Sequence, residues 1–258
     1  MEELESLRVI TLVDNDVWER GLASSWGLSF YVEAQIEGRQ HKVLMDTSGS
    51  SDALFGNTSK LGVDFSALEA LFISHWHSDH CGSLGHILPL LRRSNPIYVP
   101  SLSLYGFKTI VEAGGFPKVC SKPTKLMEGM MSTGEMGNGI EEHSLLINVK
   151  KMGLVVLTGC SHPGIIDIAK RAQEVSGIAN IYAVMGGFHI SSVHEGINVA
   201  KSLCEMGVKL ISPCHCTHIE AKTGIAKVIG EGYVRNGSGR IISIGCSEPF
   251  DRKLSKKI

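Results

Sequence analysis

Three histidines and an aspartate lie within six residues in the segment His75-Trp76-His77-Ser78-Asp79-His80. Imidazole nitrogens and carboxylate oxygens are common protein ligands of zinc, iron and manganese. His75 and His77 can close on one ion, while Asp79 and His80 leave the chain in other directions and can hold a second. Two ions roughly 3.5–4 Å apart can bind both an attacking water and a leaving oxygen. The motif therefore predicts a dinuclear metal site, with a solvated histidine-rich turn as the alternative.

Buried strands are the elements that must position these residues. The apolar run 70–73 comes directly before the motif and is typical of a short buried strand. Three further apolar runs end in a histidine-containing turn and give way to a helical pattern. In strand-then-helix architectures the loops at one edge of the sheet gather at a common site, so we expect all four turns to converge. The three runs are 154–157, 181–185 and 208–212, and their turns contain His162, His189 and His215.

Hairpins and amphipathic helices account for most of the remaining chain. Asp46 ends the first hairpin, which is typical of a turn or helix cap, or of a carboxylate that orients a metal-bound histidine. The expected hairpins pair 28–36 with 41–45 and 144–149 with 154–157. Other strands are expected at 7–13, 97–99 and 240–244, and helices at 53–61, 83–92, 165–175, 193–206 and 220–229.

Residues 101–139 lack clear periodicity. We predict that they form loops and short helices inserted into a single domain spanning 1–258, lying over the site or forming an oligomer contact. They are also the segment expected to act as a lid. The basic tail 252–257 is expected to be frayed and solvated.

Composition argues for a compact intracellular protein. The 25 lysines and arginines balance 26 acidic residues, so no overall field attracts nucleic acid or a membrane surface. No stretch approaches the roughly 20 apolar residues of a membrane span, and the acidic N-terminus has no signal-peptide core. Seven cysteines without a C-x-x-C pair argue against a disulfide scaffold. We predict a cytoplasmic protein with reduced thiols.

Four features together resemble the metallo-β-lactamase superfamily. They are Asp46 after a hairpin, the H-x-H-x-D-H motif at 75–80, a strand ending in Thr158-Gly159-Cys160, and a late strand ending in His215. The resemblance runs from about residue 7 to residue 244. It implies an α/β fold, the αββα sandwich, with the metals at one edge.

Three segments are similar to a narrower group, the 7,8-dihydropterin-6-yl-methyl-4-(β-D-ribofuranosyl)aminobenzene 5′-phosphate synthase-like proteins. This resemblance implies a transferase that condenses a dihydropterin methyl pyrophosphate with a ribosyl-aminobenzene phosphate in a methanopterin-type pathway. Many chains with these motifs are described simply as metal-dependent hydrolases. The segments are 159–165, 182–189 and 213–217.

Several positions depart from the superfamily pattern. Residues 46–49 are one residue longer than the usual Asp-Thr-Gly, and Trp76 replaces a small residue and could crowd or line the pocket. Residues 141–144 stand where the superfamily places a further histidine, and Cys160 replaces its bridging aspartate. We favour His162 over Cys160 as the missing ligand, which leaves Cys160, like Asp46, to support the ligands from outside.

Two divalent ions are the expected cofactors, with zinc preferred and manganese, iron or magnesium as alternatives. A shared water would have its pKa lowered toward neutrality, and Asp79 is the catalytic residue that can hold its proton. His189 is the candidate contact for a substrate phosphate. The assignment places His75, His77 and His162 on one ion, and Asp79, His80 and His215 on the other.

Three kinds of function remain open. The first is an enzyme, either the transferase or a hydrolase of a phosphoester or lactone. The second is a metal-binding module without turnover. The third is a nucleic-acid-processing enzyme, against which the near-neutral charge and the absence of an appended domain both count. We therefore expect a small anionic substrate, no nucleic-acid or membrane partner, and a homo-oligomer as one possible state.

Overall fold

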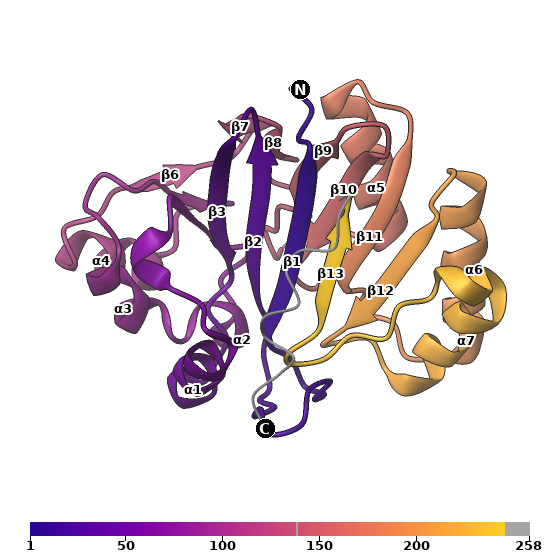
Figure 1. Ribbon diagram of the computed structural model, residues 1–258, viewed down its shortest axis with the longest axis horizontal. Coiled ribbons are helices and arrows are strands. Elements are labelled where there is room, and N and C mark those ends of the chain that lie inside the picture. Colours follow the sequence, from indigo (N-terminus) through magenta and orange to yellow (C-terminus); the bar gives the residue numbers. More distant parts are fainter. Residues whose placement is uncertain (138, 246–258) are drawn as a thin grey trace.

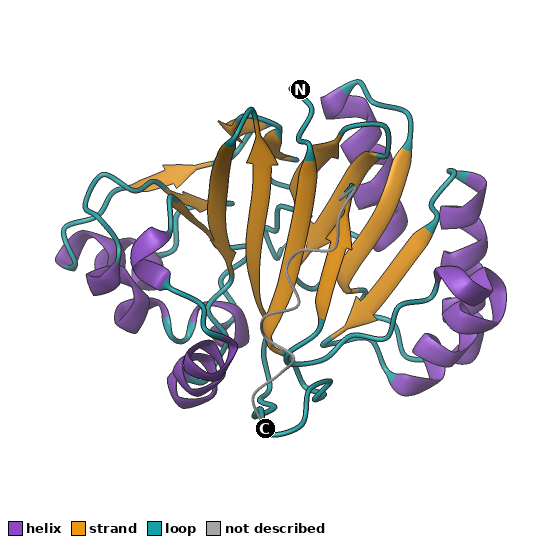
Figure 2. Ribbon diagram, viewed as in Figure 1, coloured by secondary structure: helices purple, strands orange, loops and turns teal. Residues whose placement is uncertain are grey.

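The computed structural model describes residues 1–137 and 139–245, in which two β-sheets pack face to face with helices on both outer sides (Figures 1 and 2). This four-layer αββα sandwich is the predicted fold class. The predicted tail at 252–257 lies outside the described residues. None of the helices in the described part of the chain is long and apolar enough to cross a membrane.

The first sheet has seven strands in the order β13-β1-β2-β3-β4-β5-β6. The pairs β13–β1, β1–β2 and β2–β3 are antiparallel. The pairs β3–β4, β4–β5 and β5–β6 are parallel. The strands are β13 (Ile241–Ile244), β1 (Ser6–Val13), β2 (Ser29–Ile36), β3 (Arg39–Met45), β4 (Ala70–Phe72), β5 (Ile97–Val99) and β6 (Pro117–Val119).

The second sheet has six strands in the order β12-β11-β10-β9-β8-β7. β10, β11 and β12 run parallel, so their carboxyl ends meet at one edge of the sheet. The strands are β12 (Leu210–Cys214), β11 (Ile181–Gly187), β10 (Gly153–Thr158), β9 (Leu145–Val149), β8 (Met130–Ser132) and β7 (Thr124–Met127).

Helices cover the outer face of each sheet (Figure 2). The first sheet carries α1 (Ser51–Leu61), α2 (Ser78–Cys81), α3 (Leu84–Ile87) and α4 (Leu104–Glu112). The second carries α5 (Ile165–Ser176), α6 (Val193–Glu205) and α7 (Ile219–Ile229). Three short 3₁₀ turns complete the elements: η1 (Phe65–Ala67), η2 (Leu88–Leu90) and η3 (Gly230–Gly232).

Strand alternation divides the apolar residues among three layers of core. In β2, Phe30 and Val32 lie in the core between the sheets, whereas Tyr31 points to the opposite face and packs in the core beneath α1 and α3. Successive side chains of a strand point to opposite faces, so one strand serves two cores. A third core lies between the second sheet and α5 to α7. The central strands of both sheets are therefore buried on both faces, which fixes the strand ends that carry the site.

Two sequence-based predictions of local structure were wrong. The expected helix at 83–92 is two short pieces, α3 and η2, because Pro89 lacks the N–H that a continuing helix would need. The segment 101–139 contains α4, as expected, but it also supplies β6, β7 and β8 to the two sheets. These strands have three or four residues, too few for alternation to be recognised, and they form because neighbouring strands pair with them.

Helices α6 and α7 approach each other backbone to backbone. A Cβ atom added at Gly196 would lie 2.2 Å from the Ala221 carbonyl oxygen, and one at Gly224 would lie 2.3 Å from the Val193 carbonyl oxygen. Neither helix can carry a larger residue at these positions without moving away from the other. The pair of glycines therefore sets the distance between the two helices.

We predict that Gly196→Ala destabilises the fold by about 1–3 kcal/mol, because the added methyl group overpacks this contact. The matched control is Gly56→Ala in α1, where an added Cβ meets nothing within 4 Å. That change should stabilise the protein by about 0.5–1 kcal/mol through helix propensity. Urea unfolding of both variants measures the difference, and equal stabilities would contradict the close packing of α6 on α7.

Candidate metal centre

The four histidine-bearing turns converge on one cluster of ligand atoms. One group consists of His75, His77 and His162, and a second of Asp79, His80 and His215; within each group the ligand atoms lie within 4.8 Å of one another. The groups adjoin, since the ring centroids of His75 and His80 are 4.1 Å apart. The structure therefore brings together all six residues predicted as ligands, in the same two sets of three.

Left-handed backbone conformations place several of these residues. Asp46, Ser161, His189 and His215 have φ values of 60°, 59°, 52° and 50°. Residues other than glycine seldom adopt this conformation, and it costs of order 1 kcal/mol or more at each position. Each of these residues directly follows or lies close to the end of β3, β10, β11 or β12. The sharp reversal at a strand end turns the next side chains toward the common edge.

Asp46 orients two histidines from behind. Its Oδ2 accepts a hydrogen bond from His80 Nδ1 at 2.7 Å and another from the Ser74 hydroxyl at 2.7 Å, while its Oδ1 accepts from the Ser74 backbone N–H at 2.7 Å. The Ser74 hydroxyl in turn lies 3.0 Å from His75 Nδ1. Burial raises the pKa of Asp46 to about 7. The expected role of Asp46, to hold ligand histidines in place, fits these contacts.

Glu142 holds His162 in the same way. Its Oε2 accepts from His162 Nδ1 at 2.8 Å and from the His162 backbone N–H at 2.9 Å, while its Oε1 accepts from the backbone N–H groups of Cys160 and Ser161, both at 2.9 Å. Burial alone would raise the pKa of Glu142, but these donors, led by His162, hold it well below its usual range. Glu142 is therefore an ionised carboxylate that shapes the whole turn after β10.

The loop after β1 holds His215. Asn15 Oδ1 lies 3.1 Å from His215 Nδ1, and the Asn15 side-chain amide donates to the His215 carbonyl oxygen at 3.0 Å. The buried carboxylate of Asp14 accepts from the His215 backbone N–H at 2.7 Å. Two residues from the beginning of the chain thus fix a ligand 200 positions away.

These outer contacts determine which nitrogen of each ring faces the cluster. Nε2 of His80 and Nε2 of His215 lie 3.1 Å apart, and His75 Nε2 lies 3.1 Å from His77 Nδ1. Nε2 of His215 also lies 3.2 Å from the Asp79 carboxylate. Nitrogen and oxygen ligand atoms this close together suit a cation among them. The donor set therefore fits divalent metal ions of the kind that imidazole and carboxylate bind.

Protonation also favours ligation at neutral pH. Burial lowers the pKa of His75 and of His80 to about 3, with a smaller contribution from neighbouring histidines, so both rings are neutral. Burial would raise the pKa of Asp79, but the hydrogen bond with His215, 3.2 Å away, holds it well below its usual range. The same hydrogen bond outweighs burial at His215 and raises the pKa of that ring. Neutral imidazoles, such as His75 and His80, and an ionised carboxylate are the forms that bind metal.

Cys160 lies closer to the ligands than a purely supporting residue would. Its Sγ is 3.2 Å from His80 Nε2, and it shares ligand-distance groups with His75 and His80, with His162 and His189, and with His215 and Cys216. The hydrogen bond with Cys216, together with burial, raises the pKa of Cys160 and so favours the neutral thiol. The thiol thus lies between the two groups, and His162 stays the predicted ligand.

Three further residues named in the sequence analysis lie at or near the cluster, and their contacts differ. His189 is exposed and its ring centroid is 5.0 Å from that of His162, so it stands at the edge of the cluster. Trp76 turns away, donating from Nε1 to the Ser101 carbonyl oxygen at 3.0 Å and packing against Gly106 of α4. His143 is buried against Phe72, 3.9 Å between ring centroids, with Nε2 directed at the Ile73 carbonyl oxygen.

Sequence reasoning missed Glu142, Asp14 and Asn15 as site residues. Glu141 and Glu142 stand where a further histidine is expected, and burial distinguishes the two, since Glu142 is fully buried and Glu141 exposed. Asp14 and Asn15 follow directly after the first strand, which is the same strand-end signal that identified the histidines. The signal was present, but an aspartate and an asparagine after a strand are also typical of an ordinary turn.

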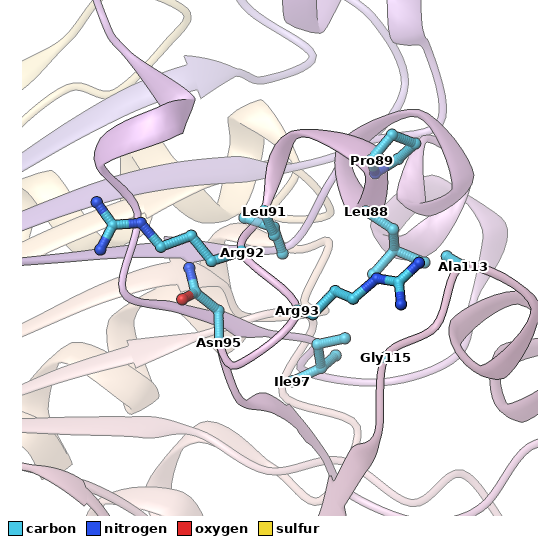
Figure 3. A pocket seen from close by; sticks show the side chains of 9 residues that line it. All are labelled: Leu88, Pro89, Leu91, Arg92, Arg93, Asn95, Ile97, Ala113 and Gly115. Carbon is cyan, nitrogen blue, oxygen red and sulfur yellow. The ribbon is translucent and has the colours of Figure 1, made fainter.

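A hollow of about 240 Å³ lies elsewhere, between η2, β5 and the end of α4 (Figure 3). Arg92, Arg93 and Asn95 are its polar lining residues. It contains none of the candidate metal ligands. The chemistry therefore belongs to the histidine cluster and not to this hollow.

Comparisons with known proteins agree with this geometry. The 7,8-dihydropterin-6-methyl-4-(β-D-ribofuranosyl)-aminobenzene-5′-phosphate synthase of Methanocaldococcus jannaschii is 27% identical, over 93% of this chain and 97% of the synthase. The crystal structure of Tm1679, described as a metal-dependent hydrolase of the β-lactamase superfamily, has a TM-score of 0.72 and 25% identity, covering 92% of this chain and 98% of Tm1679. YhfI from Bacillus subtilis, a metallo-β-lactamase fold protein, has a TM-score of 0.64 and 14% identity, covering 92% and 99%. No family model matches the chain.

We predict that Glu142→Gln lowers metal affinity by about 10–100-fold, because the amide cannot accept from His162 and from three backbone N–H groups together. The control is Glu141→Gln at the exposed neighbouring position, which should leave affinity unchanged. Calorimetric titration of the metal-free proteins with zinc measures the effect, after circular dichroism has shown that both variants are folded. Equal affinities would contradict the role of Glu142.

His143 makes stability depend on pH. Burial lowers the pKa of His143 from 6.5 to about 3, so the unfolded chain binds a proton there that the folded protein does not. The contribution of the neutral His143 to the free energy of unfolding is complete above pH 6.5 and declines as the pH falls toward 3. Between pH 6.5 and 5, we predict that the wild type loses roughly 1.5 kcal/mol more unfolding free energy than His143→Gln. Urea unfolding tests this, with exposed His194→Gln expected to retain the wild-type slope.

Proposed function

We propose that the chain is a metal-dependent enzyme of the metallo-β-lactamase superfamily that joins a dihydropterin methyl pyrophosphate to a 4-(β-D-ribofuranosyl)aminobenzene 5′-phosphate. The observation that carries the proposal is the pairing of two three-ligand sets with near full-length similarity to a synthase of this reaction. The substrates are small and anionic, which suits a site built to hold cations.

Two divalent ions, with zinc preferred, would be held by the two ligand sets. When bound, such ions neutralise the charge that develops on the pyrophosphate as it leaves. The two sets are His75, His77 and His162, and Asp79, His80 and His215.

The chain's own residues supply orientation and proton transfer. As the amino nitrogen bonds to the methylene carbon, the carbon–oxygen bond breaks, pyrophosphate departs and the nitrogen loses a proton. Asp79 is ionised and faces the cluster, so it can accept that proton. His189, exposed at the edge of the cluster, is positioned to contact a substrate phosphate. Helix α4, which packs on Trp76 next to His75 and His77, belongs to the segment proposed to exclude water.

A hydrolase of a phosphoester or lactone is the second candidate. The same ligand sets support it, and Tm1679, similar over nearly its whole length, is described as a metal-dependent hydrolase. In that case Asp79 would hold the proton of an attacking water. A metal-binding module without turnover is the third, and it would show full metal occupancy without any reaction.

The test is pyrophosphate release from the pterin substrate in the presence and absence of the aminobenzene substrate. We predict that release requires both substrates, stops when metal is chelated, and returns on adding zinc. Asp79→Asn should lower kcat by about 100-fold or more, because it removes both a ligand and the proton acceptor.

The control is His86→Ala at an exposed histidine of α3, which should leave kcat unchanged. Release that proceeds equally without the aminobenzene substrate would identify a hydrolase instead. Metal-loaded protein that converts neither the pterin pair nor a phosphodiester or lactone would favour the binding module.

A further inference from the structure

Trp26 exposes its ring next to a metal ligand. Its side chain is 65% exposed, and its ring centroid lies 5.3 Å from that of His215 at an interplanar angle of 53°. Large aromatic side chains usually bury their surface, so an exposed tryptophan beside a reactive centre marks a surface prepared for a ligand. Its neighbour His215 directs Nε2 at His80.

The loop around Trp26 is fixed to the residues of the metal centre. The Gly27 N–H donates to Asn15 Oδ1 at 3.2 Å, and the same oxygen lies 3.1 Å from His215 Nδ1. A Cβ atom at Gly27, where φ is 135°, would lie 2.4 Å from the Asp79 carbonyl oxygen. The backbone next to Trp26 is therefore packed against the turn that carries Asp79, while the Trp26 ring lies beside His215.

The other two tryptophans have other partners. Trp76 packs on Gly106 and donates to the Ser101 carbonyl oxygen. Trp18 lies under the Arg240 guanidinium, 4.1 Å from the ring centroid. Among the tryptophans, Trp26 combines an exposed ring with contact to the candidate ligands.

We propose that Trp26 is the platform on which the planar dihydropterin ring of the substrate stacks, an inference that rests on the proposed function. One methylene group separates that ring from the pyrophosphate, so a pyrophosphate at the cluster puts the ring beside it. The attacking amine approaches the methylene carbon from the side opposite the leaving group, which places the aminobenzene ring farther from the ions. The ring of Trp26, next to His215, matches the position of the pterin.

Stacking on tryptophan suits this ligand. A bicyclic heteroaromatic ring presents a flat face, and aromatic pairs of this kind prefer offset or tilted arrangements with centroids several ångströms apart. The backbone beside Trp26 is fixed through Gly27, which limits the conformational entropy lost by the loop on binding. Trp26 would thus select planar substrates, while the metal ligands select the phosphate.

The test compares two probes on metal-loaded protein by calorimetry: 6-hydroxymethyl-7,8-dihydropterin, which carries the ring alone, and inorganic pyrophosphate. We expect Trp26→Ala to weaken ring binding roughly tenfold and to leave pyrophosphate binding within about twofold. Trp26→Phe should retain ring binding within about threefold. Trp18→Phe, a change at the other exposed tryptophan, should alter neither.

Unchanged ring binding in Trp26→Ala would overturn the proposal, and so would an equal loss of both probes, which would show a structural role. The outcome is separable from that of the proposed function. If the substrate pair forms no condensation product but Trp26→Ala still weakens binding of the pterin ring, the stacking proposal is supported and the transferase assignment fails. If the pair reacts normally and ring binding does not depend on Trp26, the transferase assignment is supported and the stacking proposal fails.

Discussion

The crowding of imidazole and carboxylate ligand atoms in one buried cluster is the constraint on which the rest of this site depends. Buried carboxylates behind the rings, above all Asp46 and Glu142, accept hydrogen bonds from Nδ1 of His80 and His162, so Nε2 of these rings faces inward as an acceptor. Such a buried polar cluster is costly without a cation and favourable with one. The fold thus holds the ligands in a binding geometry before the metal binds, which limits the conformational entropy that the ligands lose on binding.

The sandwich provides this geometry by placing strand ends at one edge. Parallel pairing of β10, β11 and β12 puts three turns in register, and parallel pairing of β3 with β4 puts Asp46 beside the start of the H-x-H-x-D-H motif. Residues with a left-handed backbone conformation then turn the chain sharply just after each strand. Since the central strands of both sheets are buried on both faces, they cannot slide without exposing apolar residues, so the core fixes the ligand positions.

The strand-turn-helix pattern predicted the converging turns, and the resemblance of the H-x-H-x-D-H motif and its companion segments to the metallo-β-lactamase superfamily implied the four-layer fold. These signals are local in sequence, since each lies within about two dozen residues. What the sequence did not reveal depends on long-range contacts. The pairing of β6, β7 and β8 is set by neighbouring strands, and Glu142 acquires its role because burial and the turn after β10 surround it with donors. An exposed glutamate of the same local sequence, Glu141, has no such role.

The ligand cage serves hydrolysis and group transfer equally well, because both reactions need cations near a departing oxygen. The difference between them must therefore lie in what occupies the approach to the reacting carbon. Trp76 is turned toward α4, whereas Trp26 stands exposed beside His215. A planar ring seated on Trp26 would displace water from this approach, since stacked rings exclude solvent from the faces that they share. The surface that selects the substrate would thereby also favour an amine over water as the nucleophile.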